Sequence, residues 1–258
     1  MQLCRNVPLC MSPKPRIAAR REAEVRAQAL PRITLLRHGE PDWEPQEGGP
    51  TVRHPGLTEY GHAQALASAG AIAADGVDAI YVSPYPRAQE TARPLAEASG
   101  VEPVTVQDLR EIGVRFDGLN QEEVDRMFVE ASRRPLDEHW EGWPGGERFT
   151  DFHGRAVAAL TEVLALHHIV PEKQSDFTVW HVPEGTTPRI AIVAHGGTNA
   201  VLLTHLLDIR PVPWEWLRFE SALCAYSVVQ ARPLGAAGHV WSLQNFNELD
   251  PQRDAGLR

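Results

Sequence analysis

Short apolar runs alternate with amphipathic stretches along most of this chain. The runs with the length and composition of buried β-strands lie at 33–36, 79–82, 103–106 and 190–193. Apolar residues recur at helical spacing in other segments, at 57–74, 87–99, 119–131, 150–168 and 199–207. Strands that alternate with helices are typical of an α/β fold, here with a mostly parallel central sheet and helices on both of its faces.

Residues with capping and turn preferences mark several of the expected boundaries. Thr58 has the side chain of a helix N-cap, Asp75-Gly76 is expected to end that helix, and Gly100 to end the next. Two later apolar stretches, at 225–230 and 240–243, are predicted to be the closing strands of the sheet.

A long segment, residues 107–188, separates the third predicted strand from the fourth. Its helical patterns predict a helical cap insertion over one end of the sheet, not a second domain. The last part, residues 171–188, contains several prolines and is predicted to form an exposed loop.

The two ends of the chain differ from this pattern. Residues 1–31 carry several Lys and Arg but few acidic residues, and they lack the apolar core of a secretory signal peptide. We expect a basic arm that is disordered or partly helical; an organelle transit peptide, or a true start at Met11, is the alternative. Residues 249–258 are expected to form a tail.

Composition and charge exclude several classes of function. Of 258 residues, 43% are hydrophobic and 23% are charged, which is ordinary for a globular domain with a substantial core. The formal net charge of −9 argues against a nucleic-acid partner. No apolar run approaches the ~18 residues of a membrane span, so we expect no membrane partner.

Cysteine and histidine spacing argues against disulfides and metals. Cys4, Cys10 and Cys224 show no paired spacing, which favours a reducing, cytoplasmic location over a disulfide framework. His167 and His168 are adjacent and would point ~100° apart on a helix, so they cannot face one ion. The other histidines show no ligand spacing, and we expect no metal ion and no cofactor.

Charged and imidazole side chains directly follow the predicted strands. Arg37 and His38 follow the first strand, Arg87 follows the second, and His195 follows the fourth. The carboxyl ends of parallel strands meet at one edge of a sheet, where ligands bind in open α/β folds. Guanidinium forks and an imidazole that converge there suit a phosphate dianion. Gly39 would let the backbone approach such a ligand closely.

Four motifs then occur in a fixed order along the chain. They are R-H-G at 37–39, S-x-x-x-R-A-x-x-T-A at 83–92, L-R-E at 109–111 and A-H-G-G at 194–197. On these residues the chain resembles the histidine phosphatase superfamily, also called the phosphoglycerate mutase-like fold, over roughly residues 32–245. The resemblance implies one catalytic domain at 32–248, with the basic arm before it and the tail after it.

The resemblance also implies roles for the residues at the strand ends. His38 would be the nucleophile that becomes a phosphohistidine, with its other ring nitrogen held as N–H by a backbone carbonyl. Arg37, Arg87, His195 and Gly196 would bind the phosphate, and His195 would also stabilise charge in the transition state. Such a site needs no metal ion, because its barrier is mainly electrostatic and positional.

A leaving alkoxide also needs a proton donor. Glu111, in the L-R-E motif, is the best match to the family's acid and would later activate the water. Glu40, Glu44 and Asp117 are the competing candidates for this role. The alternative interpretation of Glu111 is an ordinary surface glutamate.

The resemblance favours a phosphatase over a mutase. Mutases carry E-R-H-Y-G after the proton donor, whereas this chain reads E-I-G-V-R at 111–115. Gly145-Gly146-Glu147 resembles the phosphatase-type G-G-E-S, and Arg133-Arg134 only faintly echoes the arginine pair with which mutases bind carboxylate. Pro41 and Glu44 replace polar residues that often help to bind phosphate, so contacts from that loop are in doubt.

We therefore predict a metal-independent phosphomonoester hydrolase. The alternatives are a phosphotransferase of the mutase type and a non-catalytic protein that keeps the phosphate pocket. The expected partner is a small phosphorylated substrate, with a phosphoprotein left open, and a homodimer is possible by analogy with the family. Trp214, Trp216 and Trp241 are interpreted as packing residues.

Overall fold

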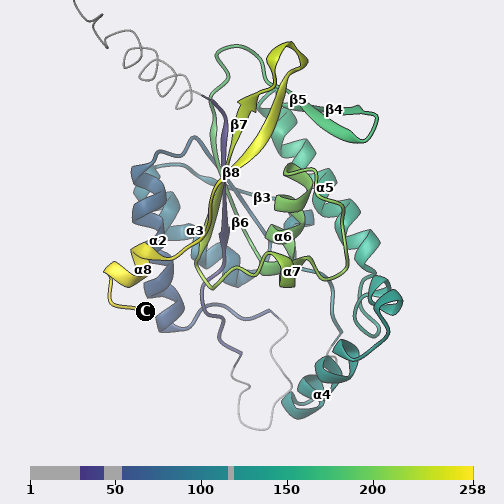
Figure 1. The fold of residues 1–258 in the computed structure, drawn as a ribbon. Helices are drawn as coiled ribbons and strands as arrows, with labels where there is room; N and C mark the ends of the chain where they lie inside the picture. Colours follow the sequence, from purple (N-terminus) through teal and green to yellow (C-terminus); the bar gives the residue numbers. More distant parts are fainter. Residues whose placement is uncertain (1–29, 44–53, 116–118, 258) are drawn as a thin grey trace, which may run out of the picture.

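The computed structural model describes residues 30–43, 54–115 and 119–257, which fold around one eight-stranded sheet (Figure 1). The strands are β1 (Arg32–Arg37), β2 (Ala79–Val82), β3 (Pro103–Thr105), β4 (Val170–Gln174), β5 (Phe177–His181), β6 (Arg189–Ala194), β7 (Tyr226–Pro233) and β8 (His239–Glu248). The α-helices are α2 (Glu59–Ala74), α3 (Pro86–Ser99), α4 (Gln121–Ser132), α5 (Phe149–Leu166), α6 (Gly196–Leu206), α7 (Glu215–Arg218) and α8 (Asp250–Asp254). The short 3₁₀ helices are η1 (Gln107–Leu109), η2 (Leu136–Glu141) and η3 (Gly235–Ala237).

The sheet has a parallel half and an antiparallel half. Its strand order is β3-β2-β6-β1-β7-β8-β5-β4. The pairings of β2 with β3, of β2 with β6 and of β1 with β6 are parallel, while the pairings from β1 through β7 and β8 to β4 are antiparallel. The predicted α/β fold with parallel central strands is therefore confirmed, and the antiparallel half is larger than the sequence indicated.

Alternating side chains on the central strands bury both faces of the sheet. On β6, Ile190 and Ile192 pack in a core cluster with residues of α5 and α6, whereas Ala191 and Val193 pack in a second cluster with residues of α2 and α3. These two helix pairs lie on opposite faces of the sheet (Figure 1). Burial on both faces explains why the strand reads as a continuous apolar run.

The long segment between β3 and β6 divides into three parts. α5 belongs to the main body, because Phe152, Ala156 and Leu160 are fully buried in the core under the sheet. α4 lies outside that body, beyond the end of the sheet, and forms the helical cap with η2 (Figure 1). Asn120 begins α4 with a capping box, in which its side chain and that of Glu123 bond each other's backbone N–H.

The third part corrects the prediction for residues 171–188. The exposed loop predicted there is wrong, because β4 and β5 form a hairpin that extends the antiparallel half of the sheet. Val179 and Trp180 of β5 are buried. Pro171 is tolerated because β4 is the edge strand, where a missing N–H removes no ladder bond.

Local signals at the helix ends are confirmed. The Thr58 hydroxyl caps α2 by accepting a bond from the Gly61 N–H at 2.9 Å. Gly100 ends α3 at φ 72°, in the left-handed region that glycine tolerates. The range 249–258 contains α8, whose buried Gln252 donates to the Leu223 carbonyl at 3.0 Å.

Two further expectations concern the N-terminal basic arm and the absence of a membrane span. The basic arm falls almost entirely on residues 1–29, which lie outside the described residues. Within the ranges that the structure covers, no helix has both the length and the apolar character needed to cross a bilayer.

Packing of α5 against the sheet predicts a matched pair of stability effects. Replacing the fully buried Leu160 with Ala should lower the free energy of unfolding by about 3 kcal/mol, since it leaves a cavity in the main core. Replacing Leu166, which is 69% exposed on the same helix, with Ala should change the free energy of unfolding by less than about 0.5 kcal/mol. Urea unfolding of both variants tests the pair, and equal losses would contradict the assignment of α5 to the core.

Candidate active site

Adjacent parallel strands bring the predicted site residues to one edge of the sheet. β1 and β2 flank β6, so His195, which follows β6, lies between the segment that carries Arg37 and His38 and the segment that carries Arg87. The His38 N–H donates to the Ala194 carbonyl at 3.0 Å, and the ring centres of His38 and His195 lie 5.2 Å apart. The sequence-based expectation that these side chains converge holds in the structure.

The ring of His38 is held in one tautomer. Its Nδ1 lies 2.7 Å from the backbone carbonyl oxygen of Gly39, which can only accept, so the proton is on Nδ1 and Nε2 carries a lone pair. Burial, and then the positive charges of Arg87 and Arg37, lower the pKa of His38 well below its usual value. The imidazole is therefore neutral near pH 7 and has a free nitrogen for attack.

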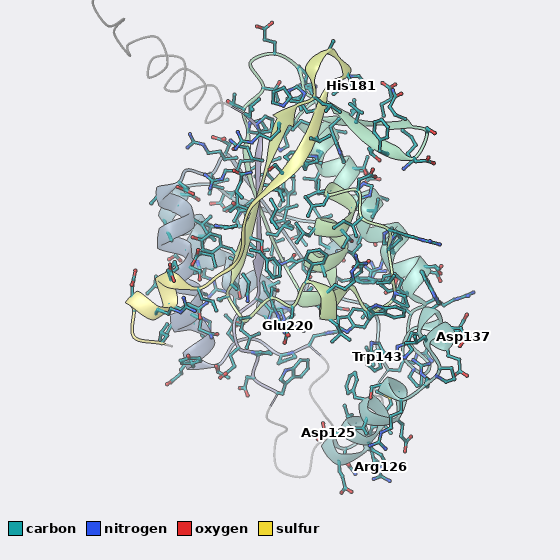
Figure 2. All side chains as sticks on the ribbon, viewed as in Figure 1. Asp125, Arg126, Asp137, Trp143, His181 and Glu220 are labelled. Carbon is teal, nitrogen blue, oxygen red and sulfur yellow. The ribbon has the colours of Figure 1, made fainter. Side chains whose placement is uncertain are left out.

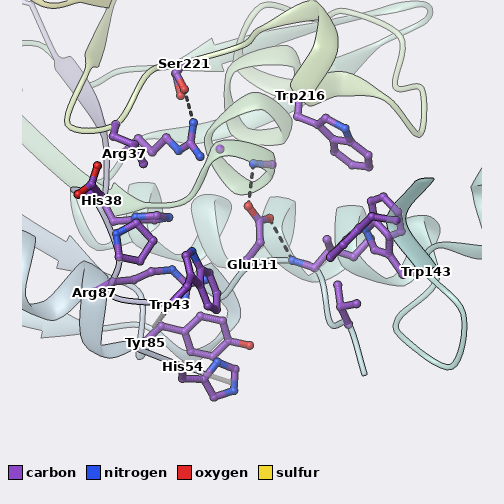
Figure 3. Close-up of a pocket in the computed structure, with 18 of the residues that line it drawn as sticks. Arg37, His38, Trp43, His54, Tyr85, Arg87, Glu111, Trp143, Trp216 and Ser221 are labelled. Carbon is purple, nitrogen blue, oxygen red and sulfur yellow. Dashed lines mark hydrogen bonds between the residues drawn. The ribbon is translucent and has the colours of Figure 1, made fainter. Parts of the chain in front are cut away.

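Two guanidinium groups face this ring from a largely buried setting. Arg37 donates through Nη1 to the Ser221 carbonyl (Figure 3). The Arg87 guanidinium lies 5.0 Å from the ring centre of Tyr85 and 5.5 Å from that of Trp43. Arg37 Nε and Arg87 Nε and Nη1 are buried without a hydrogen-bond partner in the described residues. Buried charged donors without partners are costly, which favours an anion at this position.

His195 lies beside the His38 ring, but it is fully buried and does not line the cavity. Its Nε2 lies 2.7 Å from the Ser83 hydroxyl, and its Nδ1 is buried without a partner in the part of the chain described. Burial is the main cause that lowers the pKa of His195 well below its usual value. The positive charge that His38 carries when protonated, and then that of Arg87, lower this pKa further. When Ser83 donates to Nε2, the proton of the neutral ring is on Nδ1, a donor available to an anion.

The carboxylate of Glu111 lies in the same cavity and is fixed by two backbone amides. Oε1 accepts from the Ile112 N–H at 3.0 Å and Oε2 from the Gly197 N–H at 2.8 Å. A Cβ on Gly197 would lie 2.5 Å from Glu111 Oε1, so the second glycine of the A-H-G-G motif makes room for the acid. Gly196 lines the cavity beside Arg37 at the start of α6.

The rival acids have other positions. Glu40 lines the cavity, but its Oε1 accepts from the Thr58 hydroxyl at 3.0 Å, where it supports the start of α2. Glu44 and Asp117 lie outside the described residues. Among the described acids, Glu111 has the position best suited to a leaving group.

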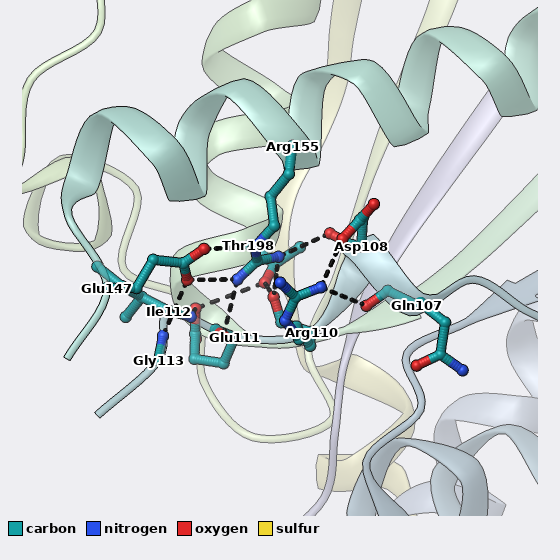
Figure 4. A network of polar contacts seen from close by, with 9 residues as sticks. All are labelled: Gln107, Asp108, Arg110, Glu111, Ile112, Gly113, Glu147, Arg155 and Thr198. Carbon is teal, nitrogen blue, oxygen red and sulfur yellow. Dashed lines mark hydrogen bonds and ion pairs between the residues drawn. The ribbon is translucent and has the colours of Figure 1, made fainter. Parts of the chain in front are cut away.

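A buried ion pair supports the backbone that carries Glu111 (Figure 4). Arg155 of α5 forms a two-pronged pair with Glu147, at 2.7 Å on each oxygen. It also donates to three backbone carbonyls at 2.8–3.0 Å, those of Asp108, Arg110 and Glu111. Burial raises the pKa of Glu147, but the bonds from Arg155 and from the Gly113 N–H outweigh it, and the net pKa is lowered. The G-G-E motif pointed to Glu147, whereas nothing in the sequence pointed to Arg155.

Gly39 has a different purpose from the one predicted. It does not line the cavity, and a Cβ there would lie 2.6 Å from the Gly61 carbonyl oxygen and 3.2 Å from Cys224 Sγ. Its small size therefore allows α2 to approach β1 closely, and the prediction that it approaches a ligand is wrong.

Arg37, His38, Arg87, Glu111 and Gly196 form the floor of a cavity of about 1090 Å³. Most of its aromatic wall was not recognised from the sequence, and comprises Trp43, His54, Tyr85, Phe128, Trp143 and Trp216. Trp216, interpreted as a packing residue, also contacts the main core, while Trp241 is buried as expected. No group of three or more metal-binding side chains occurs in the described ranges.

Comparison with known proteins agrees with this geometry. Residues 33–244 match the family model described as histidine phosphatase superfamily (branch 1). The chain belongs to this superfamily.

Individual relatives carry both phosphatase and mutase names. Phosphoserine phosphatase 1 of Hydrogenobacter thermophilus is 32% identical over 138 residues, which are 53% of this chain and 65%, just under two thirds, of that protein. A 2,3-bisphosphoglycerate-dependent phosphoglycerate mutase of Bartonella quintana is 29% identical over 175 residues, 65% of this chain and 82% of that one. A mycobacterial glucosyl-3-phosphoglycerate phosphatase has the same fold, with TM-score 0.62 and 24% identity over 84% of this chain and 98% of its own. Family membership thus indicates phosphatase or mutase activity.

The buried histidines predict a loss of stability in acid. His38 and His195 resist protonation in the folded protein, whereas in the unfolded chain they take protons near their ordinary pKa of about 6.5. The free energy of unfolding should therefore fall below that pH, by up to about 1.4 kcal/mol per pH unit for each histidine.

Urea unfolding between pH 7.5 and 5.5 measures this slope. His195→Gln should flatten it, whereas His62→Gln, a change at an exposed histidine, should not. An equal slope in wild type and His195→Gln would show that His195 protonates equally in the two states.

Proposed function

We propose that this protein is a phosphomonoester hydrolase that acts through a phosphohistidine at His38 and needs no metal ion. The observation that carries the proposal is the neutral His38, whose lone pair on Nε2 faces buried guanidinium donors without partners. A phosphate dianion would satisfy those donors and would bring phosphorus within reach of the nucleophile.

In the first step, His38 Nε2 attacks phosphorus, and the bond from phosphorus to the ester oxygen breaks in line with the attack. A protonated Glu111 gives its proton to the departing oxygen, which leaves as a neutral alcohol. Arg37, Arg87 and His195 bind the equatorial oxygens and stabilise the charge that they carry in the transition state.

In the second step, water takes the place of the alcohol. The Glu111 carboxylate removes a proton from that water as its oxygen bonds to phosphorus and the bond between phosphorus and Nε2 breaks. Inorganic phosphate leaves, His38 returns to its neutral form, and Glu111 holds the proton for the next cycle.

Contacts in the cap favour the hydrolase over the mutase. A mutase must bind the carboxylate of its sugar acid, and Arg133-Arg134 was the candidate pair. Neither residue lines the cavity, and Arg134 donates to the carbonyls of Ala131 and Gly142 at 3.1 and 2.6 Å. The presence of nucleophile, acid and phosphate donors together argues against the non-catalytic alternative.

Substitution of the nucleophile tests the proposal directly. Wild type should release phosphate from simple phosphomonoesters in the presence of EDTA, and His38→Ala should be slower by more than about 10³-fold because the covalent route is lost. An acid-labile phosphoenzyme should form in wild type only. His181→Gln, on the hairpin far from the cavity (Figure 2), is the control. Activity that EDTA abolishes, or that His38→Ala retains, would refute the mechanism.

The role of Glu111 predicts a dependence on the leaving group. Glu111→Gln should lower kcat/KM for an alkyl phosphate by about 10²–10⁴-fold, but should change kcat/KM for 2,4-dinitrophenyl phosphate little, because kcat/KM reports formation of the phosphoenzyme and that oxygen leaves without a proton.

Gly197→Ala should show the same pattern, since its Cβ would displace the carboxylate. Gly154→Ala, where a Cβ meets open space, is the matched control. An equal loss of kcat/KM on both esters would show that another group gives the proton to the leaving oxygen, with Glu40 the next candidate.

A further inference from the structure

The direction of the reaction divides the cavity into two parts. In-line displacement places the leaving oxygen on the side of phosphorus opposite His38, next to the proton donor. Figure 3 shows Glu111 between two ends of the cavity, with His38 and Arg87 at one end and Trp143 and Trp216 at the other. The remainder of the substrate therefore extends from Glu111 toward the two tryptophans.

Aromatic and aliphatic side chains from three separate segments line this second part. Phe128 of α4 meets Trp143 edge to face, with ring centres 4.6 Å apart and an angle of 77° between the planes. Trp216 comes from α7, and all three rings are only half-buried. The buried Val124 and the exposed Leu217 extend the apolar lining. These half-buried rings offer flat apolar surface that a ligand can cover.

The size of the cavity exceeds what a phosphate group needs. Its volume of about 1090 Å³ lies just above the range, about 300–1,000 Å³, that is typical of pockets for drug-sized ligands. A leaving group of the size of a ring can therefore enter beside the phosphate.

Apart from Arg37 and Arg87, the charged side chains of the described lining are acidic. Among the described lining residues, Arg37 and Arg87 are the arginines, and lysine is absent. The carboxylates in the lining, besides Glu111, are those of Glu40, Asp42, Asp125 and Glu220. Figure 2 shows Glu220 at the end of the sheet and Asp125 on α4 of the cap.

Three other described arginines near the site lie outside the cavity lining. Arg155 pairs with Glu147 behind the backbone of Glu111, and Arg134 bonds to backbone carbonyls. Neither lines the cavity, and nor does Arg115, which follows the lining residue Val114.

We propose that the region lined by Phe128, Trp143, Trp216 and Glu220 is a leaving-group subsite for an apolar, ring-sized alcohol without negative charge. The substrates would be phosphomonoesters whose phosphate is their sole anionic group. This inference rests on the proposed hydrolase function and deepens it. A carboxylate or second phosphate on the leaving group would face the field of these carboxylates, and the described lining offers no cation besides the two phosphate-binding arginines.

A matched series of alcohol esters tests this subsite, because their leaving oxygens all depend on Glu111 in the same way. The series is benzyl phosphate, 4-carboxybenzyl phosphate, 4-(aminomethyl)benzyl phosphate, n-propyl phosphate and 3-phosphoglycerate. We expect kcat/KM for benzyl phosphate to exceed that for its carboxylated analogue by at least about tenfold. The aminomethyl ester should match or exceed the benzyl ester, and n-propyl phosphate should be poorer for lack of ring contact.

Variants then connect this selectivity to the named residues. Glu220→Gln should raise the rate on the carboxylated ester relative to the benzyl ester by about threefold or more, since one repelling charge is removed. Trp143→Ala should reduce the ratio of benzyl to n-propyl rates. Glu184→Gln, an exposed turn residue before β6 at the opposite edge of the sheet, should leave every ratio unchanged. Circular dichroism confirms that each variant is folded.

The outcomes separate the two proposals. Equal or faster hydrolysis of 4-carboxybenzyl phosphate or 3-phosphoglycerate would overturn the subsite while leaving the hydrolase in place. Ratios that do not respond to Glu220→Gln and Trp143→Ala would overturn the assignment to these residues. No phosphate release from any ester by folded wild type would overturn the hydrolase, and the subsite with it.

Discussion

The site depends on two largely buried guanidinium groups, several of whose donors have no hydrogen-bond partner in the described residues. Arg37 and Arg87 have lost most of their hydration, which lowers their pKa, and Glu111 is the carboxylate whose field acts most strongly on both. The same positive field keeps His38 neutral, because a proton on its ring would add a further buried charge. One constraint therefore underlies both the proposed affinity for a dianion and the lone pair of the proposed nucleophile. The parallel half of the sheet holds those groups at adjacent strand ends.

Position in the chain explains which parts the sequence predicted. His38, Arg87 and His195 follow apolar runs whose length defines a strand, so topology alone placed them together. The hairpin of β4 and β5 was missed because Pro171 and the polar residues around it give β4 no apolar pattern, and the buried part of β5 is only the pair Val179-Trp180. Parallel strands buried on both faces give a strong signal, and edge strands give a weak one.

The walls of the cavity could not be predicted for a different reason. Phe128, Trp143 and Trp216 come from segments that have no fixed spacing from the catalytic motifs, and an aromatic residue at helical spacing is equally consistent with a core position. Trp216 in fact serves both purposes, with one part against the core and another in the cavity. Arg155 was hidden for a similar reason, since its contacts are to backbone carbonyls, which leave no pattern in the sequence.

The floor of the site is held largely by main-chain atoms, and this has an evolutionary consequence. His38 bonds to the Gly39 carbonyl, Glu111 to the amides of Ile112 and Gly197, and Arg37 to a carbonyl as well. Main-chain partners survive most substitutions of the residues that provide them, provided that the fold is kept. The walls, by contrast, consist of side chains on surface segments. Mutation can therefore change what the cavity accepts while the groups that perform the chemistry stay in place, and a single scaffold can give rise to enzymes for many different esters.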